Sequence, residues 1–481
     1  MKKSLAILLP FLILHADESN SELLKRLQML ENEIKSLKTQ IKQNSDDVAS
    51  FEPILESVET KSILDRVNFS PELELRLDKF DYSLGNIAGE NTRIYGGQYN
   101  GQLRRDNYTK NFEPAASVRF RLNMSAALTN NVNFIGRMVI EHSSQSNERV
   151  CILSRDIKSA ESQTAMDIDR AYFDYKSDNK ENTLTFGILP TTGGTPTQYA
   201  KEDVRRSMFP ALVFDIATYG LIGTRKIGED TYARVIAAKA YTLNANIYPY
   251  QCNRENIDNA NVLGAFVDTK FTLLGDGLLS FGANFLQDFK AHPYLGPDVS
   301  SNDSHVLGDM LTLGVGADIN EFLVDDLTIF THFAISNPYP NGNVDDYQIV
   351  NQPAGTTASG NQGFSEASYA KGEMVSSNGY GVYLGTKYDI TSDIRFGAEY
   401  NYGSKYWFSA TQGAEDMYNK LATRGWATES YLIWRFHKYM YTKIGYLYIK
   451  EDYTGSGWHF GEPVSKDGKQ SIGYATLNAK F

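Results

Sequence analysis

Charged side chains recur at every second position in many segments, and this pattern is the first that could carry chemistry. Arg119 and Arg121 alternate with apolar neighbours, and Arg137 and Arg170 hold similar positions in the next two alternating segments. Successive side chains of a β-strand point to opposite faces, so such a strand has one charged and one apolar face. We therefore expect the four arginines to form a basic ladder on one wall of a sheet.

A second group of charges is compact and lies in a segment without alternation. It consists of Glu202, Asp203, Arg205 and Arg206. Gly193-Gly194 precedes it and Pro210 follows it, and both residue types favour sharp changes of chain direction. The segment 192–214 is thus a candidate constriction loop that folds inward, although an ordinary external loop would have the same composition. Gly193-Gly194 is not a phosphate-binding loop, because no Gly-Lys-Ser/Thr follows.

Residue types for catalysis or metal binding are present but not suitably spaced. His142 precedes Ser143 and Ser144, which would offer a base and a nucleophile at an outer rim. A catalytic site also needs an orienting acid brought into contact with them, and the seven scattered histidines give no such spacing. No pair of histidines has metal-ligand spacing. We expect no enzyme activity, no catalytic residues, no metal and no cofactor.

The composition favours a β-rich protein. The 481 residues include 30 Tyr, 25 Phe and 38 Gly, which suit pleated surfaces and bends. A mean hydropathy of −0.38 does not exclude a membrane protein, since a transmembrane barrel alternates apolar and polar residues. The net charge of −11 argues against nucleic acid as a partner, because binding phosphates needs a basic surface.

Two-residue alternation begins near residue 68 and continues to the end of the chain. We predict about sixteen strands, near 68–82, 114–128, 132–144, 166–177, 182–191, 215–226, 231–243, 262–274, 278–290, 309–319, 325–336, 379–390, 393–404, 428–437, 439–452 and 470–481. Short turns such as Thr129-Asn130-Asn131 alternate with long loops, which is typical of outer-membrane barrels. The predicted fold class is all-β, a transmembrane antiparallel β-barrel. A soluble β-sandwich or β-helix is the alternative.

The N-terminal part of the chain has a different pattern. Two lysines and an apolar stretch of about eleven residues predict a signal peptide over residues 1–16. Apolar residues then follow a heptad pattern that begins at Leu23 and Leu27, which predicts a periplasmic α-helical coiled coil over 17–66. One amphipathic helix packed on the chain itself is the alternative. The barrel occupies 67–481, and the coiled coil predicts a homo-oligomer, either a dimer or a trimer.

The two cysteines, Cys151 and Cys252, both lie in loop-like segments. Export would place them in an oxidising compartment, where a disulfide between them could persist. Two unpaired thiols are equally compatible with the sequence. Their separation fits no metal-binding motif.

About sixteen strands enclose more space than side chains fill, so the barrel geometry predicts a water-filled channel for passive diffusion of ions and small hydrophilic solutes. Arg119, Arg121, Arg137 and Arg170 would line it and set up a transverse field. Alternatively, they pair with Glu141, Asp174 and neighbouring acids to hold the wall together. A structural protein or adhesin that tethers the envelope, with peptidoglycan as a partner besides outer-membrane lipid, is the other function considered.

Three runs of sequence carry a family resemblance. They are Asp169-Arg170-Ala171-Tyr172-Phe173-Asp174, the run from Thr185 to Gly194, and the run from Arg206 to Asp215. Over residues 165–225 and in its layout, the chain resembles a family of uncharacterised, porin-like outer-membrane proteins of epsilonproteobacteria with an N-terminal coiled coil. The last predicted strand ends in Phe481, and a strand with a C-terminal aromatic residue resembles the signal that outer-membrane barrel assembly machinery recognises. The resemblance implies location and architecture, with no substrate or catalytic residue.

Overall fold

The structure is a computed structural model that describes residues 26, 28–35, 67–84, 108–111, 114–143, 164–205, 207–240, 260–290, 306–341, 350–351, 366–367, 375–411, 418–453, 463 and 465–481. The chain divides into two compact units, Met1–Val67 and Asn68–Phe481. Within the described ranges, no helix is both long enough and apolar enough to cross a membrane.

The first unit contributes a short described helix. Residues 26 and 28–35 are helical, and the heptad residues Leu30 and Ile34 are 51% and 42% exposed. The helix agrees with the expected secondary structure of this segment. The coiled coil, the signal peptide and the oligomer stay predictions, because most of residues 1–66 lies outside the described residues.

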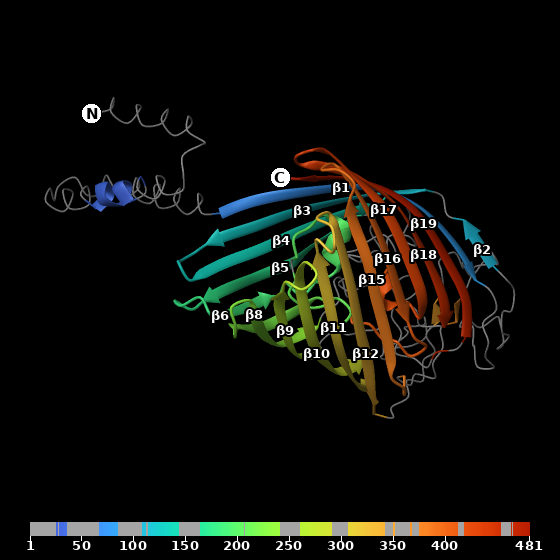
Figure 1. Ribbon diagram of the computed structural model, residues 1–481. Helices are drawn as coiled ribbons and strands as arrows, with labels where there is room; N and C mark the ends of the chain where they lie inside the picture. The colour runs from blue at the N-terminus through green and yellow to red at the C-terminus, as the bar shows by residue number, and fades with distance from the viewer. Residues whose placement is uncertain are drawn as a thin grey trace. The chain divides into compact units, whose positions relative to one another are not determined.

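The second unit is a closed antiparallel β-barrel (Figure 1). Its sheet has seventeen strands, of which β2 (Tyr108–Asn111) is a short addition beside β1. The other sixteen are β1 (Val67–Leu84), β3 (Ala115–Ala127), β4 (Val132–Ser143), β5 (Thr164–Lys176), β6 (Asn182–Ile188), β7 (Thr218–Lys226), β8 (Thr231–Ala240), β9 (Asn261–Phe271), β10 (Asp276–Lys290), β11 (Val306–Asn320), β12 (Leu327–Pro340), β15 (Gly379–Asp389), β16 (Ile394–Gly403), β17 (Gly425–His437), β18 (Met440–Tyr453) and β19 (Ser465–Lys480).

Each strand pairs with the next in this series, and β1 closes the barrel by pairing with both β3 and β19. In the closing pair, Glu72 lies opposite Lys480 and Leu84 opposite Gly468. The predicted sixteen-stranded barrel is confirmed, with strand ends shifted by a few residues. Two further residue pairs, β13 (Val350–Asn351) and β14 (Glu366–Ala367), form a separate small sheet.

Short turns and long loops alternate between the two rims, as expected. Turns 128–131, 177–181, 227–230, 272–275, 321–326, 390–393 and 438–439 form one rim. Two of these turns share a local device: the Thr129 hydroxyl accepts the N–H of Asn131, and the Thr391 hydroxyl accepts the N–H of Asp393, both at 3.2 Å. Such bonds give a partner to backbone N–H groups of the turns that form no hydrogen bond within the sheet.

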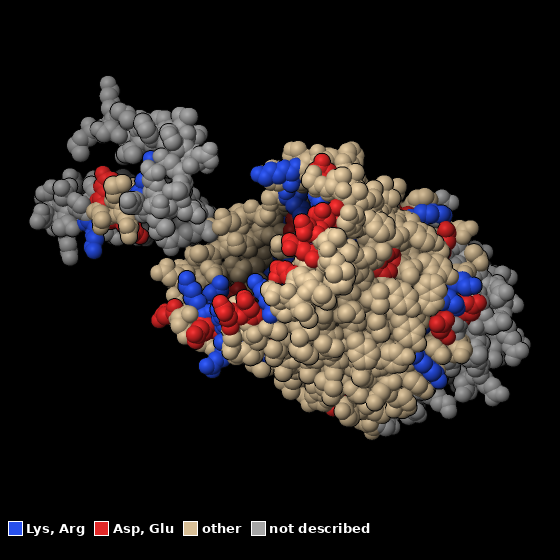
Figure 2. All heavy atoms as spheres, in the orientation of Figure 1, with Lys and Arg blue, Asp and Glu red and all other residues tan. Residues whose placement is uncertain are grey.

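The outer surface of the wall is apolar. Leu73, Leu75 and Leu77 of β1 are 38%, 40% and 51% exposed, whereas the alternate residues Glu74 and Asp78 are buried. Figure 2 shows a broad band with few charges on the visible face and charged atoms gathered towards its ends. The two-residue period thus separates an apolar exterior from a charged interior, as the sequence predicts.

Glycines in the wall make room for large inward side chains. A Cβ atom at Gly445 would lie 2.3 Å from the ring of Tyr474, whereas a Cβ atom at Gly473 would have no neighbour within 4 Å. Tyr474 of β19 in turn donates a hydrogen bond to Glu429 of β17, on the other side of β18. Gly445 therefore allows a buried ring to lie directly on the backbone.

We predict that Gly445→Ala lowers the free energy of unfolding by about 1–3 kcal/mol, because the ring must leave its position. The readout is the temperature at which purified protein loses its β circular dichroism. Gly473→Ala adds the same methyl group where there is space and should leave that temperature unchanged. An equal loss in both variants would contradict the assigned ring contact.

Candidate functional site

The long loop 189–217, between β6 and β7, runs inside the barrel. Its Phe209 packs edge-on against Phe266 of β9 with ring centroids 4.5 Å apart, and its Glu202 binds Arg435 of β17. Five strands separate β9 from β17 in the wall. A segment that contacts both can do so only through the interior.

Two glycines and one aspartate shape the base of this loop. Gly193 has a φ of +78°, which favours glycine, and a Cβ atom at Gly194 would lie 1.8 Å from the carbonyl oxygen of Phe209. The N–H of Gly193 donates to the Asp215 carboxylate at 3.3 Å. The inward turn expected from Gly193-Gly194 therefore has two separate steric causes, and Asp215 joins the two ends of the loop.

Asp215 is fully buried at this base. Burial raises its pKa to about 7, against the opposing effect of Lys201 and of the Gly193 N–H. A carboxyl with a raised folded-state pKa binds its proton more tightly in the folded than in the unfolded state. Its contribution to stability is therefore complete below pH 4 and is lost as pH rises towards 7.

We predict that Asp215→Asn removes this pH dependence. The wild-type unfolding temperature should fall between pH 5 and pH 8 relative to that of the variant, because only the wild type must hold a buried charge at pH 8. Over this pH range the free-energy difference is about 3 kcal/mol. Parallel melting temperatures for both proteins across this range would refute the assignment.

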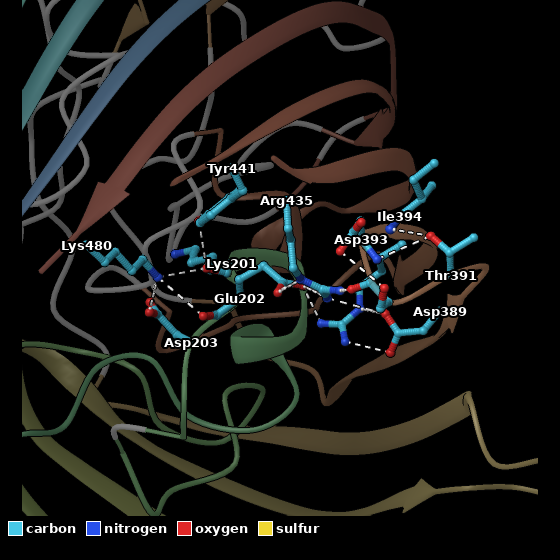
Figure 3. A network of polar contacts seen from close by, with 12 residues as sticks. Lys201, Glu202, Asp203, Asp389, Thr391, Asp393, Ile394, Arg435, Tyr441 and Lys480 are labelled. Atoms are coloured by element: carbon cyan, nitrogen blue, oxygen red, sulfur yellow. Dashed lines mark hydrogen bonds and ion pairs between the residues drawn. The ribbon is translucent and has the colours of Figure 1, made fainter. Parts of the chain in front are cut away.

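The tip of the loop binds the wall close to the short-turn rim (Figure 3). Arg435 donates to both carboxylate oxygens of Glu202, at 2.7 and 2.9 Å, and Arg395 pairs with the same carboxylate. Asp389 binds Arg395 at 2.7 Å and Arg435 at 3.3 Å. These four residues lie next to turns 390–393 and 438–439, so the loop extends from one rim almost to the other.

A second set of contacts holds the adjacent part of the tip to β18 and β19. Lys480 pairs with Asp203 and also donates to the carbonyl of Lys201 at 3.1 Å. Tyr441 donates to that same carbonyl at 2.9 Å. The next residue, Val204, is 83% exposed and takes part in none of these contacts. The tip is thus held by its charges and by its backbone carbonyls.

The remaining charges of the expected cluster have different positions. Arg205 lies 3.6 Å from Asp268 of β9, which also pairs with Arg234 of β8. Arg206 lies outside the described residues, as do Cys151 and Cys252. Glu202, Asp203 and Arg205 therefore contact three separate parts of the wall.

A second inward loop, described over residues 404–411 and 418–424, was not singled out from the sequence. The Trp407 ring is buried and donates to the carbonyl of Leu421 at 2.8 Å. The N–H of Asp215 donates to the carbonyl of Ala410 at 2.7 Å, so the two inner loops are joined. The sequence feature that could have identified this second loop is its concentration of apolar residues, including Trp407 and Leu421.

The four arginines of the expected ladder lie on adjacent strands β3, β4 and β5, and all are buried. The partners of these arginines come from three parts of the structure. Arg119 pairs with Glu74 at 3.1 Å, Arg121 with Glu72 at 3.9 Å, Arg137 with Asp169, and Arg170 with the carbonyl of Thr192 at 3.1 Å. These partners belong to β1, β5 and the inner loop, and the alternative of pairing with Glu141 and Asp174 stays a prediction.

A cavity of about 90 Å³ remains between the inner loops and the wall. The loops contribute Thr197, Ala200, Lys201, Asp203, Tyr418, Lys420 and Leu421 to it, and β1, β3, β15, β17, β18 and β19 supply the rest of its lining. Because one water needs about 10–15 Å³ of such a cavity, the cavity has room for several waters or one small solute. Among the described residues, no group of three or more His, Cys, Asp and Glu could hold a metal ion.

Comparison with known proteins gives a family and several barrels. The profile of a family described as "Protein of unknown function (DUF3373)" matches residues 109–478. No curated protein matches the sequence. The match agrees with the expected resemblance to an uncharacterised family, while the bacterial group and the coiled coil expected from that resemblance stay predictions.

Solved structures similar to this chain include three outer-membrane proteins. OprB of Pseudomonas putida at high pH is 11% identical, with 88% of this chain and 96% of that chain covered and a TM-score of 0.46. The channel DcaP of Acinetobacter baumannii is 14% identical, with 86% and 97% covered and a TM-score of 0.44. OmpT of Vibrio cholerae is 10% identical, with 86% and 97% covered and a TM-score of 0.43. Likenesses at this level assign no role to any residue here.

Proposed function

Since the family profile spans more than half of the chain, the chain belongs to the DUF3373 family of proteins of unknown function, and we propose that it forms a porin-type channel in the outer membrane. The channel would allow passive diffusion of ions and small hydrophilic solutes. The observation that carries the proposal is a closed barrel with an apolar exterior and a charged interior that retains a cavity.

The exterior supports a place in a lipid bilayer. Exposed aromatic residues lie at both ends of the apolar band, as in the aromatic girdles of outer-membrane barrels. Tyr175, Tyr388, Phe436 and Tyr439 lie towards the short-turn rim, and Tyr219, Tyr339 and Tyr380 lie towards the long-loop rim; all are more than 40% exposed. Such rings prefer the boundary between headgroups and hydrocarbon.

The interior supports conduction of polar solutes. Among the described residues, buried acidic and basic side chains lie on nine of the sixteen strands, namely β1, β3, β4, β5, β8, β9, β11, β16 and β18. In a barrel of sixteen strands the wall alone cannot fill the lumen, so the inner loops determine how much of it stays open. We propose that loop 189–217, with Glu202, Asp203 and Arg205 at its tip, is the constriction, and that the arginines of β3 to β5 contribute to its field.

Planar-bilayer recording of the purified full-length protein tests this function. We expect stepwise ionic currents from protein whose folded state is verified by its heat-modifiable mobility on a denaturing gel. Folded protein that never produces current steps would exclude the channel function and favour the tethering role considered from the sequence.

The N-terminal unit enters the proposal through its heptad pattern. We propose that residues 1–16 are a signal peptide and that residues 17–66 form a periplasmic coiled coil that joins copies of the chain. Cross-linking of the full chain should then give dimers or trimers, and deletion of 17–66 should abolish them. Equal cross-linking with and without this segment would place the contacts between copies elsewhere.

A further inference from the structure

The charges around the lumenal cavity differ in balance from those of the chain as a whole. The chain has 58 acidic and 47 basic residues, but the cavity lining has seven basic and four acidic side chains. The three arginines, Arg76, Arg119 and Arg121, all belong to the wall. The four lysines are Lys201 and Lys420 of the inner loops and Lys443 and Lys480 of the wall. The composition of the chain alone would give a lining with more acids than bases.

Each of the four acids of the lining already has a basic or amide donor. Glu74 accepts from Arg119 at 3.1 Å, and Glu72 accepts from Asn123 at 2.8 Å. Asp203 pairs with Lys480. A cation that entered the cavity would have to displace one of these donors to gain a carboxylate.

The fourth acid, Glu429, is shared among several donors. Lys420 pairs with it, Lys443 lies 3.5 Å away, and Tyr474 donates its hydroxyl hydrogen to it. Two lysines thus balance one carboxylate of the lining. Behind the lining, Asp78 pairs with Arg76 and Glu399 pairs with Lys420, and counting both leaves the charge balance of the site positive.

The basic groups come from both sides of the cavity. Lys201 belongs to one inner loop and Lys420 to the other, whereas Lys443 lies on β18 of the wall. Lys443 also donates to the carbonyl of Ala200 at 2.8 Å, which fixes its ammonium group beside the loop. An anion between loop and wall would contact positive charge on two sides, in a site where low dielectric strengthens that attraction.

We propose that this cavity is a binding site for small oxyanions, carboxylates or phosphates, within the diffusion path. The inference rests on the proposed channel function. Arginine and lysine N–H groups provide charge-assisted hydrogen bonds to such oxygens, and the hydroxyls of Thr197 and Thr476 add neutral donors to the same lining. The site makes the channel prefer anions although the protein is acidic.

The test uses full-length protein in a planar bilayer with a potassium chloride gradient. The reversal potential should shift towards the equilibrium potential of chloride and away from that of potassium. Inorganic phosphate and malonate, added separately, should reduce the chloride current in a concentration-dependent manner, whereas glycerol and ethylammonium at equal concentrations should not. Reduction by one of the two anions alone assigns the site to that class of oxyanion.

Variants place the effect at the cavity. Lys201→Gln combined with Lys443→Gln should weaken the reduction by either anion about tenfold, because two charge-assisted bonds are lost. Lys450→Gln is the matched control: Lys450 lies on the same strand as Lys443 but pairs with Asp452 and Asp467 outside the cavity. If the double variant does not fold, Lys201→Gln alone must weaken the reduction.

The outcomes separate this inference from the channel function. Current steps with a reversal potential on the potassium side, or anion effects unchanged in the lysine variants, would overturn the oxyanion site and leave the channel standing. A complete lack of current steps from folded protein would remove the channel proposal itself.

Discussion

Replacing residues 196–210 of the inner loop by a short Gly-Ser linker should increase the single-channel conductance several-fold. The loop crosses the lumen from the long-loop rim to Glu202 near the other rim, so its removal widens the narrowest cross-section. The linker can be short because the N–H of Ala211 donates to the carbonyl of Thr195 at 2.9 Å. The base of the loop, including Gly193 and Asp215, stays intact.

The barrel wall should survive this replacement, since its strands pair independently of the loop tip. Circular dichroism of the purified variant checks the β content before any recording. The substitution Val204→Ala in the intact loop serves as the control, because this exposed side chain holds no wall contact. Unchanged conductance after the replacement would assign the main resistance to loop 404–424.

Glu202→Ala should produce a noisy channel with a lower unfolding temperature. The substitution removes the carboxylate that bridges Arg395 and Arg435, and it leaves Asp389 as the one remaining acid of the network for both guanidinium groups. The partly buried bridge is about 14% exposed at Glu202, so we expect a loss of about 1–3 kcal/mol. The free tip should then fluctuate in the lumen.

Two readouts distinguish the charge from the anchoring. Glu202→Gln keeps a hydrogen-bond acceptor but removes the charge. Its unfolding temperature should therefore be higher than that of Glu202→Ala, whereas both variants should shift the reversal potential by the same amount. Current noise recorded at constant voltage reports the anchoring. A quiet Glu202→Ala channel with wild-type melting would show that Asp203 and Lys480 hold the tip by themselves.

The fold could be predicted from the sequence because the strand period is local information. Leu73, Leu75 and Leu77 show their common face by spacing alone, and each strand needs only its own alternation. The predicted ends of strands were less accurate where contacts with another segment determine the last strand residue. Strand β7 begins at Thr218 and not at 215, because the N–H of Asp215 bonds to the second inner loop instead of to a neighbouring strand.

The site could be predicted only in part, because its contacts join residues far apart in the chain. The inward position of Glu202 and Asp203 was expected from Gly193-Gly194, but their partners Arg435 and Lys480 could not be identified from spacing. The four arginines of β3 to β5 are buried on the wall, and their role as pore-lining residues stays a prediction. Glu74 and Glu72, which pair with Arg119 and Arg121, come from β1, which becomes a neighbour only when the barrel closes.

The anchored tip of the inner loop also has a consequence for the order of folding. Arg435 and Lys480 lie 233 and 277 residues beyond the loop residues that they bind. Contacts of such sequence separation form late, because the intervening chain must first be ordered. The loop can therefore reach its final position only after β17 and β19 have joined the wall. A newly closed barrel would then pass through a stage with an unobstructed lumen, and the last strand would complete both the wall and the narrow passage.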